Sequence, residues 1–171
     1  MIKLVEPSEK YMKSYIEAFE EYKNHNVLSY GLSDATTTDI LEKFDNYKNE
    51  RNLKSGRVGA HFFWLVDDEK DHFIGEISIR HNLNEVLEKY GGHIGYGIRF
   101  SEWNKGFGTL MLKLSLIEAK RIGLSRILIT CDDDNVGSAR VMEKNGFMLS
   151  DKIENNFDDG TIVTRRYWKT I

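Results

Sequence analysis

Two glycines, Gly106 and Gly108, stand between a strand candidate and an amphipathic helix candidate, an arrangement that can bind an anion. The stretch Gly92–Arg121 reads as a glycine-containing strand, a short polar loop and a helix that begins on the second glycine. The first N–H groups of a helix lack partners within it, and the aligned peptide dipoles add partial positive charge there. We therefore expect a phosphate-sized anion to bind at this point.

Three side chains near this stretch can take up a proton: Glu76, His81 and His93. Glu76 lies in Phe73–Arg80, a segment that alternates two unlike faces as a strand does. If its face lines a cleft, burial raises the pKa of Glu76 and the carboxylate can act as a general base, directly or through water. On the other face it is a solvated strand residue. His81 ends this strand, and His93 begins the next one.

Apolar periodicity predicts the elements that must position these residues. The strand candidates are Ile2–Val5, Ala60–Val66, Phe73–Arg80, His93–Phe100, Arg126–Cys131, Phe147–Ile153 and Ile162–Trp168. The helix candidates are a helix opened by Pro7 and Ser8, then Thr38–Asn49, Leu83–Tyr90, Phe107–Ile122 and Asn135–Asn145. Turn residues between the last two strands predict a hairpin. The order of elements predicts an α+β (mixed α/β) fold with helices packed on a mixed sheet.

The composition is that of a single globular domain over residues 1–171. The 24 basic and 27 acidic residues give a net charge of −3, which does not favour nucleic acid or an anionic membrane surface. No segment approaches the ~20 apolar residues of a membrane span, and no apolar signal core opens the chain. The single cysteine, Cys131, forms no internal disulfide, so we expect a cytoplasmic protein with Cys131 as a small buried apolar residue.

Metal binding is not expected. The run Asp132–Asp134 reads as a solvated loop, because three consecutive carboxylates cannot all face one ion. His25, His61 and His72 have no ligand spacing.

The glycine loop fits only one of three common phosphate loops. A nucleoside triphosphate loop needs a lysine directly after its second glycine, and none follows here. A dinucleotide fingerprint needs a third glycine where Met111 stands. The remaining type is the pyrophosphate loop of acyl-CoA transferases.

On these residues the chain resembles the GNAT family of acyl-CoA-dependent N-acyltransferases. The segment Trp103-Asn104-Lys105-Gly106-Phe107-Gly108 matches the family's Gln/Arg-x-x-Gly-x-Gly/Ala loop in both glycines and departs from it at Trp103. The second family motif, an Asn followed by a short helix and Gly-Phe, matches Asn135 to Phe147. The resemblance extends over the whole element order. It implies a central mixed, mostly antiparallel twisted sheet of about seven strands, with a splayed parallel pair and helices on both faces.

The resemblance also implies acetyl-CoA as the cofactor and a set of residues that bind it. The pantetheine arm would lie between the splayed strands, paired with the backbone near Ile98, and the helix start would hold the pyrophosphate. The implied residues are Ile98, Arg99, Phe100, Lys105, Gly106, Phe107, Gly108, Thr109, Asn135 and Ser138. Two plainer interpretations stay open, namely that Gly95 and Gly97 mark only a bulge and that Asn135 is only a helix cap.

The resemblance does not supply every residue that acetyl transfer needs. The family often uses a tyrosine seven residues after the Asn as general acid, and Met142 stands there. Either another group donates the proton or the thiolate leaves without one. We take Glu76 and His81 as catalytic candidates. The family joins the strands that correspond to Phe73–Arg80 and His93–Phe100 by a tight turn. In this chain the helical insert Leu83–Tyr90 stands between them and would overhang the acceptor. We therefore expect Arg80, Asn84 and His93 to bind the substrate.

The expected activity is direct acetyl transfer to a primary amine of a small molecule, an amino acid or a peptide. No nucleophile and base pair is visible for a covalent intermediate. The alternatives are a non-catalytic acyl-CoA-binding regulatory module, which Trp103 and Met142 motivate, and a protein-interaction domain with an empty site. An edge strand near the C-terminal hairpin makes a homodimer an option.

Overall fold

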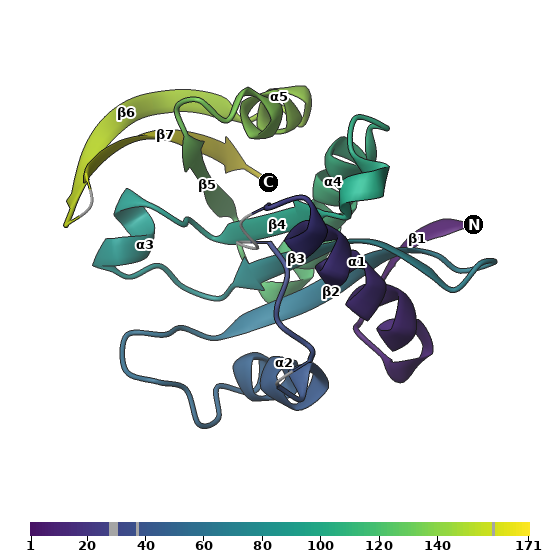
Figure 1. Ribbon diagram of the computed structural model, residues 1–171. Coiled ribbons are helices and arrows are strands. Elements are labelled where there is room, and N and C mark those ends of the chain that lie inside the picture. The colour runs from purple at the N-terminus through teal and green to yellow at the C-terminus, as the bar shows by residue number, and fades with distance from the viewer. Residues whose placement is uncertain (28–30, 37, 159) are drawn as a thin grey trace.

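The computed structural model describes residues 1–27, 31–36, 38–158 and 160–171, and its strands form two antiparallel sheets (Figure 1). The first sheet has the order β1 (Ile2–Val5), β2 (Ala60–Asp67), β3 (His72–Arg80) and β4 (Ile94–Ile98). The second has the order β5 (Arg126–Asp132), β7 (Gly160–Thr170) and β6 (Met148–Phe157). The expected α+β class is confirmed, and the expected sheet is divided in two between β4 and β5.

The two sheets meet at His93, just before β4. In the described ranges one backbone hydrogen bond joins them, from His93 N–H to the Leu128 carbonyl at 2.7 Å. Gly92 makes this contact possible, because it has a φ of +62° and a Cβ there would lie 2.5 Å from the Leu128 oxygen. Beyond this point β4 and β5 diverge (Figure 1). The splay therefore leaves one edge of β4 without a strand partner among the described residues.

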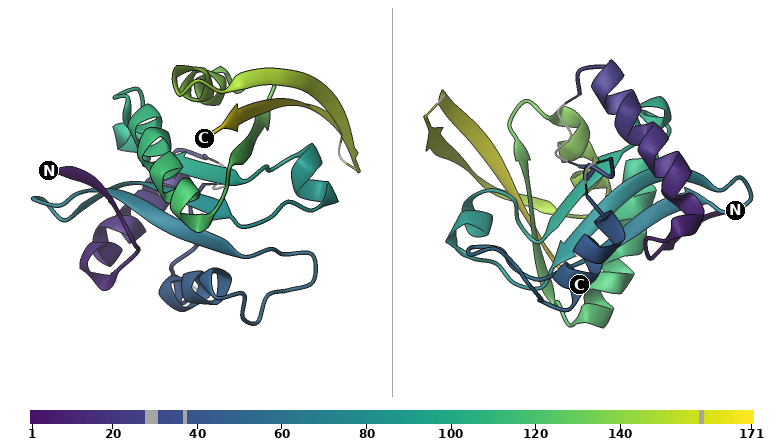
Figure 2. Two further views of the ribbon diagram at one scale, coloured as in Figure 1. Left: turned by 180° about the vertical axis from the view of Figure 1, so that it is seen from behind. Right: turned by 60° about the horizontal axis from the view of Figure 1, so that its bottom comes forward.

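Helices cover both faces of the first sheet. The short helix η1 (Glu9–Tyr11) leads into α1 (Met12–Asn24), and the next helix is α2 (Ile40–Lys48). Both α1 and α2 share an apolar cluster with Trp64, Val66 and Phe73. The helix α4 (Phe107–Ile122) packs on the opposite face, seen from behind in Figure 2, with Met111 and Leu112 in a second cluster. The remaining helices are α3 (Glu85–Lys89), η2 (Phe100–Glu102) and α5 (Val136–Lys144). No described helix combines the length and apolarity needed to cross a membrane.

Capping side chains explain where the helices differ from their predicted ranges. The second helix begins at Ile40, because the Asp39 carboxylate accepts the Glu42 N–H at 3.1 Å. The insert helix begins at Glu85, because the Asn84 side chain accepts the Leu87 N–H at 3.0 Å.

The last two strands are longer than predicted and include residues 155–157 and 160–161 of the stretch Asn155–Thr161, for which the sequence predicts a turn; residue 159 lies outside the described residues. Asn155 Nδ2 donates to Thr164 Oγ1 at 2.9 Å, and Thr161 Oγ1 donates to Asn156 Oδ1 at 2.8 Å. These cross-strand bonds satisfy polar side chains that commonly form turns, so the hairpin continues through them.

Candidate functional site

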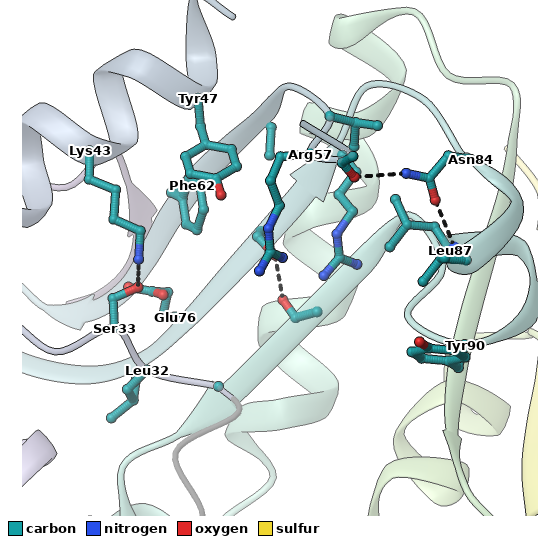
Figure 3. A pocket seen from close by; sticks show the side chains of 18 of the residues that line it. Leu32, Ser33, Lys43, Tyr47, Arg57, Phe62, Glu76, Asn84, Leu87 and Tyr90 are labelled. Carbon is teal, nitrogen blue, oxygen red and sulfur yellow. Dashed lines mark hydrogen bonds between the residues drawn. The ribbon is translucent and has the colours of Figure 1, made fainter. Parts of the chain in front are cut away.

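A cavity of about 760 Å³ lies over the face of β3 that carries Glu76, Ser78 and Arg80 (Figure 3). These residues share one face because side chains alternate along a strand. The other walls come from residues 31–34, from α2, from residues 55–58 and from the insert with α3. We call this space the Glu76 cavity. The insert thus contributes to a cavity wall.

Glu76 is the buried acid of this cavity, with 5% of its surface exposed. Trp64 Nε1–H donates to Glu76 Oε2 at 2.9 Å. Burial raises the pKa of Glu76 to about 7, against the opposing effects of the Trp64 N–H, the Tyr15 hydroxyl and the Lys43 charge. A carboxyl with such a pKa exchanges its proton near neutral pH, which is what a general base requires.

Arg80 and Asn84 also line the Glu76 cavity. Arg80 Nη1 donates to the carbonyls of Gly91 and Gly92, each at 2.8 Å. Burial, followed by the charge of Arg57, lowers the pKa of Arg80. Asn84 both caps α3 and donates to the Gly56 carbonyl at 3.0 Å, so it ties two walls of the cavity together.

His81 and His93 lie elsewhere. His81 lines a separate cavity, where its Nε2 is 2.8 Å from His61 Nδ1 and its Nδ1 is 2.8 Å from Glu50 Oε1. It follows β3 on the face of the odd-numbered residues, opposite to Glu76. The buried His93 accepts the Leu128 N–H at its Nδ1, 3.0 Å away, and so holds the junction of the two sheets. The structure brings together Glu76, Arg80 and Asn84, but neither histidine joins them.

The open edge of β4 presents backbone groups of Tyr96 and Ile98. Antiparallel pairs alternate between bonded and non-bonded positions. Arg99 N–H donates to the Ile74 carbonyl at 2.8 Å, and Arg80 N–H donates to the His93 carbonyl at 2.7 Å, so residues 93 and 99 occupy bonded positions. The backbone N–H and C=O groups of residues 96 and 98 therefore occupy non-bonded positions and point away from β3. We call these outward groups the β4 edge. Tyr96 was missed in the sequence, although strand parity contains the signal once the register is known.

The other two residues expected beside Ile98 are engaged within the protein. Arg99 uses its N–H for β3, and its guanidinium forms an ion pair with Glu21 at 2.6 Å. The Phe100 carbonyl accepts the Trp103 N–H at 3.1 Å, and its ring stacks on His25. Arg99 therefore has no N–H left for the gap, whereas the Ile98 N–H faces it.

Trp103, the residue that departs from the family loop, closes the end of β4. Its Nε1–H donates to the Ile98 carbonyl at 2.6 Å. The Tyr22 hydroxyl donates to the same carbonyl, also at 2.6 Å. The Ile98 carbonyl is therefore occupied by two donors, while its N–H stays on the β4 edge.

The glycines of the loop have two different physical roles. Gly106 is the N-cap of α4 with a φ of +85°, where a Cβ would meet nothing within 4 Å. Gly108 allows close helix packing, since a Cβ there would lie 3.2 Å from Val141 of α5. The first bond of the helix runs from Leu110 N–H to the Gly106 carbonyl, so the N–H groups of residues 107–109 precede the ladder. They can receive an anion, while the Lys105 ammonium is paired with Glu102 at 3.1 Å.

On the other side of the gap between β4 and β5, Asn135 is the N-cap of α5 and Ser138 lies in its first turn. The Asn135 side chain accepts the Ser138 N–H at 3.0 Å, so it does cap the helix. Ser138 Oγ lies 2.7 Å from the hydroxyl of Tyr96. Burial raises the pKa of Tyr96 to about 12, which keeps the phenol protonated at neutral pH. Met142 is fully buried in the core. A phenol is thus present on β4 although the family position on α5 has none.

Cys131 lies at the end of β5 and is buried. Burial raises the pKa of its thiol to about 11, so it is a thiol and not a thiolate near neutral pH. Asp133, in the expected solvated loop, forms ion pairs with Lys152 at 2.7 Å and with Arg165 at 2.5 Å.

Several solved structures share this fold at low sequence identity. The microcin C7 self-immunity acetyltransferase MccE, in complex with acetyl-CoA and AMP, is 20% identical over 99% of this chain and 92% of its own, with a TM-score of 0.71. The ribosomal L7/L12 α-N-protein acetyltransferase RimL, in complex with coenzyme A, is 18% identical over 99% and 94%, with a TM-score of 0.70. The ribosomal-protein-S5-alanine acetyltransferase from Vibrio fischeri is 18% identical over 99% and 91%, with a TM-score of 0.69.

No curated protein matches the chain significantly in sequence. The family model described as an acetyltransferase (GNAT) domain matches residues 4–148. This match covers most of the 171 residues, and the chain therefore belongs to the GNAT acetyltransferase family.

Proposed function

We propose that this protein transfers an acetyl group from acetyl-CoA directly to a primary amine of a small molecule. One observation carries the proposal. The buried Glu76 carboxyl, with a pKa of about 7, opens into a cavity on the β3–β4 sheet, while the outer edge of the neighbouring strand β4 and the start of α4 present N–H donors. A base and a set of oxyanion and phosphate donors are therefore carried by two paired strands and the helix that follows them.

The described residues fit coenzyme A. The N–H groups of residues 107–109, with the positive end of the α4 dipole, suit the pyrophosphate. The outward backbone groups of Tyr96 and the outward N–H of Ile98 suit the amides of an extended pantetheine arm, and Ser138 reaches Tyr96 from α5, whose N-cap is Asn135. Acetyl-CoA supplies an acyl group that is activated as a thioester.

The chain's own residues supply the acid–base chemistry. Glu76 accepts a proton from the acceptor's ammonium group, which leaves the amine nucleophilic. The β4 edge N–H groups stabilise negative charge that develops on the acyl oxygen. Tyr96 keeps its phenolic proton at neutral pH and is the proton donor that the chain lacks at Met142. We assign the base to Glu76 and not to His81, because His81 faces a different cavity.

A protein α-amine is the second candidate acceptor. Two structural neighbours are described as ribosomal-protein acetyltransferases, which favours it. A short peptide with a free N-terminus, compared with the same peptide N-terminally blocked and with small amines, separates the two candidates.

The test combines thermal unfolding with a thiol-release assay. A ligand at about 100 times its Kd stabilises the folded state by roughly 2.7 kcal/mol, which raises the melting temperature visibly. We expect such a rise with acetyl-CoA and with CoA, followed by amine-dependent thiol release. A rise without release against a broad amine panel would support the non-catalytic acyl-CoA-binding module. No rise would contradict the assignment of the Gly106–Gly108 loop.

A further inference from the structure

Positive charge exceeds negative charge in the Glu76 cavity, where three cationic side chains stand against the carboxyl groups of Asp34 and Glu76. Lys43, Arg57 and Arg80 all line it. Lys43 lies on the side of Glu76, where its Nζ donates to Ser33 Oγ at 3.2 Å. Figure 3 places Arg57 between this side and the side that carries Asn84 and Tyr90. Arg80 lies four residues beyond Glu76, the acid that we propose as the base, on β3.

Neither arginine side chain has an acidic partner within the described ranges. Arg80 bonds the carbonyls of Gly91 and Gly92 through Nη1, which leaves its charge uncompensated. The Arg57 side chain has no hydrogen bond or ion pair there, although its backbone N–H bonds the Lys54 carbonyl. The two like charges act on each other, since the charge of Arg57 lowers the pKa of Arg80. An anion between them would relieve both the repulsion and the burial cost of Arg80.

The sheet leaves room for such an anion beside Arg80. Gly95 stands on β4 opposite Ser78. A Cβ at Gly95 would lie 3.4 Å from Arg80 Nη2, in ordinary contact, and 3.3 Å from Ser78 Oγ, slightly closer than that. The absence of a side chain at Gly95 therefore opens the surface next to a guanidinium edge that lacks a described partner.

We propose that the acceptor is a primary amine that also carries an anionic oxyacid group, a carboxylate or a phosphate, bound between Arg57 and Arg80. This inference rests on the proposed function and names its substrate class. Glu76 and Arg80 are four residues apart on one strand, which places their Cα atoms roughly 13 Å apart. The amine and the anion of the acceptor are therefore separated by several bonds. Tyr47 and Phe62, which also line the cavity, suit an apolar connecting chain.

The test compares acceptors of one length that differ only at the far end. The probes are 6-aminohexanoate, 6-aminohexyl phosphate, hexylamine and 1,6-diaminohexane. We expect kcat/KM for at least one anionic probe to exceed that for hexylamine about tenfold or more, with the diamine poorest. The carboxylate and phosphate arms identify which oxyacid is preferred. Equal or better turnover of hexylamine or the diamine would overturn the inference while leaving the acetyltransferase assignment intact.

Arg57→Gln supplies the decisive variant, because Arg57 makes no side-chain contact on which the described fold depends. It should reduce the preference for the anionic probe over hexylamine about tenfold. Arg51→Gln is the matched control, since Arg51 lies in the same segment, pairs with Asp45 at the surface and does not line the cavity. It should leave the preference unchanged.

Direct binding keeps the inference testable if no probe is turned over. Calorimetric titration of the full protein with 6-aminohexanoate and 6-aminohexyl phosphate should give tighter binding than hexylamine, and Arg57→Gln should remove the difference. An unchanged difference in Arg57→Gln would refute the assigned position of the anion.

Discussion

Gly97 of β4 and Gly31 lie backbone against backbone. A Cβ at Gly31 would come within 2.5 Å of Gly97 Cα, and one at Gly97 within 2.8 Å of Gly31 Cα. Gly97 therefore marks a close approach of two backbones. Neither Gly95 nor Gly97 marks a bulge, since the β3–β4 register is regular through both. The approach seats residues 31–34 as a wall of the Glu76 cavity.

Gly97→Ala should displace this wall. Both partners are backbone, so the added methyl forces a shift that costs about 1–3 kcal/mol of stability. We expect a lower melting temperature and a higher KM for the acceptor, with a smaller effect on CoA affinity. Gly137→Ala is the control for stability, because a Cβ there meets only Asn135 Oδ1 at 3.7 Å. Unchanged stability and KM in Gly97→Ala would contradict the described contact.

Glu76→Gln should abolish the proposed base. General-base catalysis contributes about 10²–10⁴-fold, so kcat/KM should fall by that order. In the native protein kcat/KM should rise with pH through about 7, because only the carboxylate accepts a proton. The variant should lose this inflection. A pH–rate profile of the two proteins with one acceptor measures both effects, and an inflection retained in the variant would assign the base elsewhere.

The same group should make the fold less stable as the pH rises. The folded pKa of Glu76 is raised from 4.5 to about 7, so the native state binds more protons than the unfolded state between these values. Stability contributed by this proton is therefore lost from about pH 4.5 to about pH 7. The total is on the order of 3 kcal/mol, since one unit of pKa corresponds to about 1.4 kcal/mol.

Denaturant unfolding at several pH values checks this linkage. Glu76→Gln should be more stable than the native protein above pH 7 and close to it near pH 4.5. Glu154→Gln, at an exposed position of β6, should follow the native curve. If the free energy of unfolding of Glu76→Gln followed the same pH dependence as that of the native protein, burial would not hold the Glu76 carboxyl protonated.

The sequence was informative where one local rule decides the structure. Ile2–Val5 and the helix Phe107–Ile122 were predicted with their observed bounds. The helix begins after the first glycine of the loop, Gly106, and not on the second one, because Gly106 takes the left-handed N-cap conformation that favours glycine. The alternation along Phe73–Arg80 placed Glu76 and Arg80 on one face, but it did not show that α2 would pack on this same face and form a cavity wall there.

Register and packing decided the rest. Arg99 was expected to face the cofactor, but the pairing of β4 with β3 directs its N–H to Ile74, and such parity is not visible in one strand alone. His81 directly follows β3, and because side chains alternate along a strand, it lies on the opposite face of the sheet from Arg80 and Glu76. The contact between the Tyr96 hydroxyl and Ser138, on which we base Tyr96 as the proposed proton donor, joins β4 to α5, which is distant in sequence.

Tyr96→Phe tests the proton donor. Loss of the phenol should lower kcat at least about tenfold with little change in melting temperature, since the ring remains. Ser138→Ala removes the partner of the hydroxyl but leaves the phenol, so its effect on kcat should be smaller. If Tyr96→Phe retains native kcat, the leaving thiolate needs no acid from this residue.

Gly106→Ala tests the anion site against a control from the same helix. Gly106 and Gly123 begin and end α4 with φ values of +85° and +101°, and a Cβ at either position meets nothing within 4 Å. Alanine at either position should therefore cost about 1–2 kcal/mol of stability through backbone strain alone. Only Gly106→Ala should also weaken CoA binding, because it reorients the N–H groups of residues 107–109. Calorimetric Kd values for CoA measure the difference, and an equal loss of affinity in Gly123→Ala would show that general destabilisation, and not the anion site, is responsible.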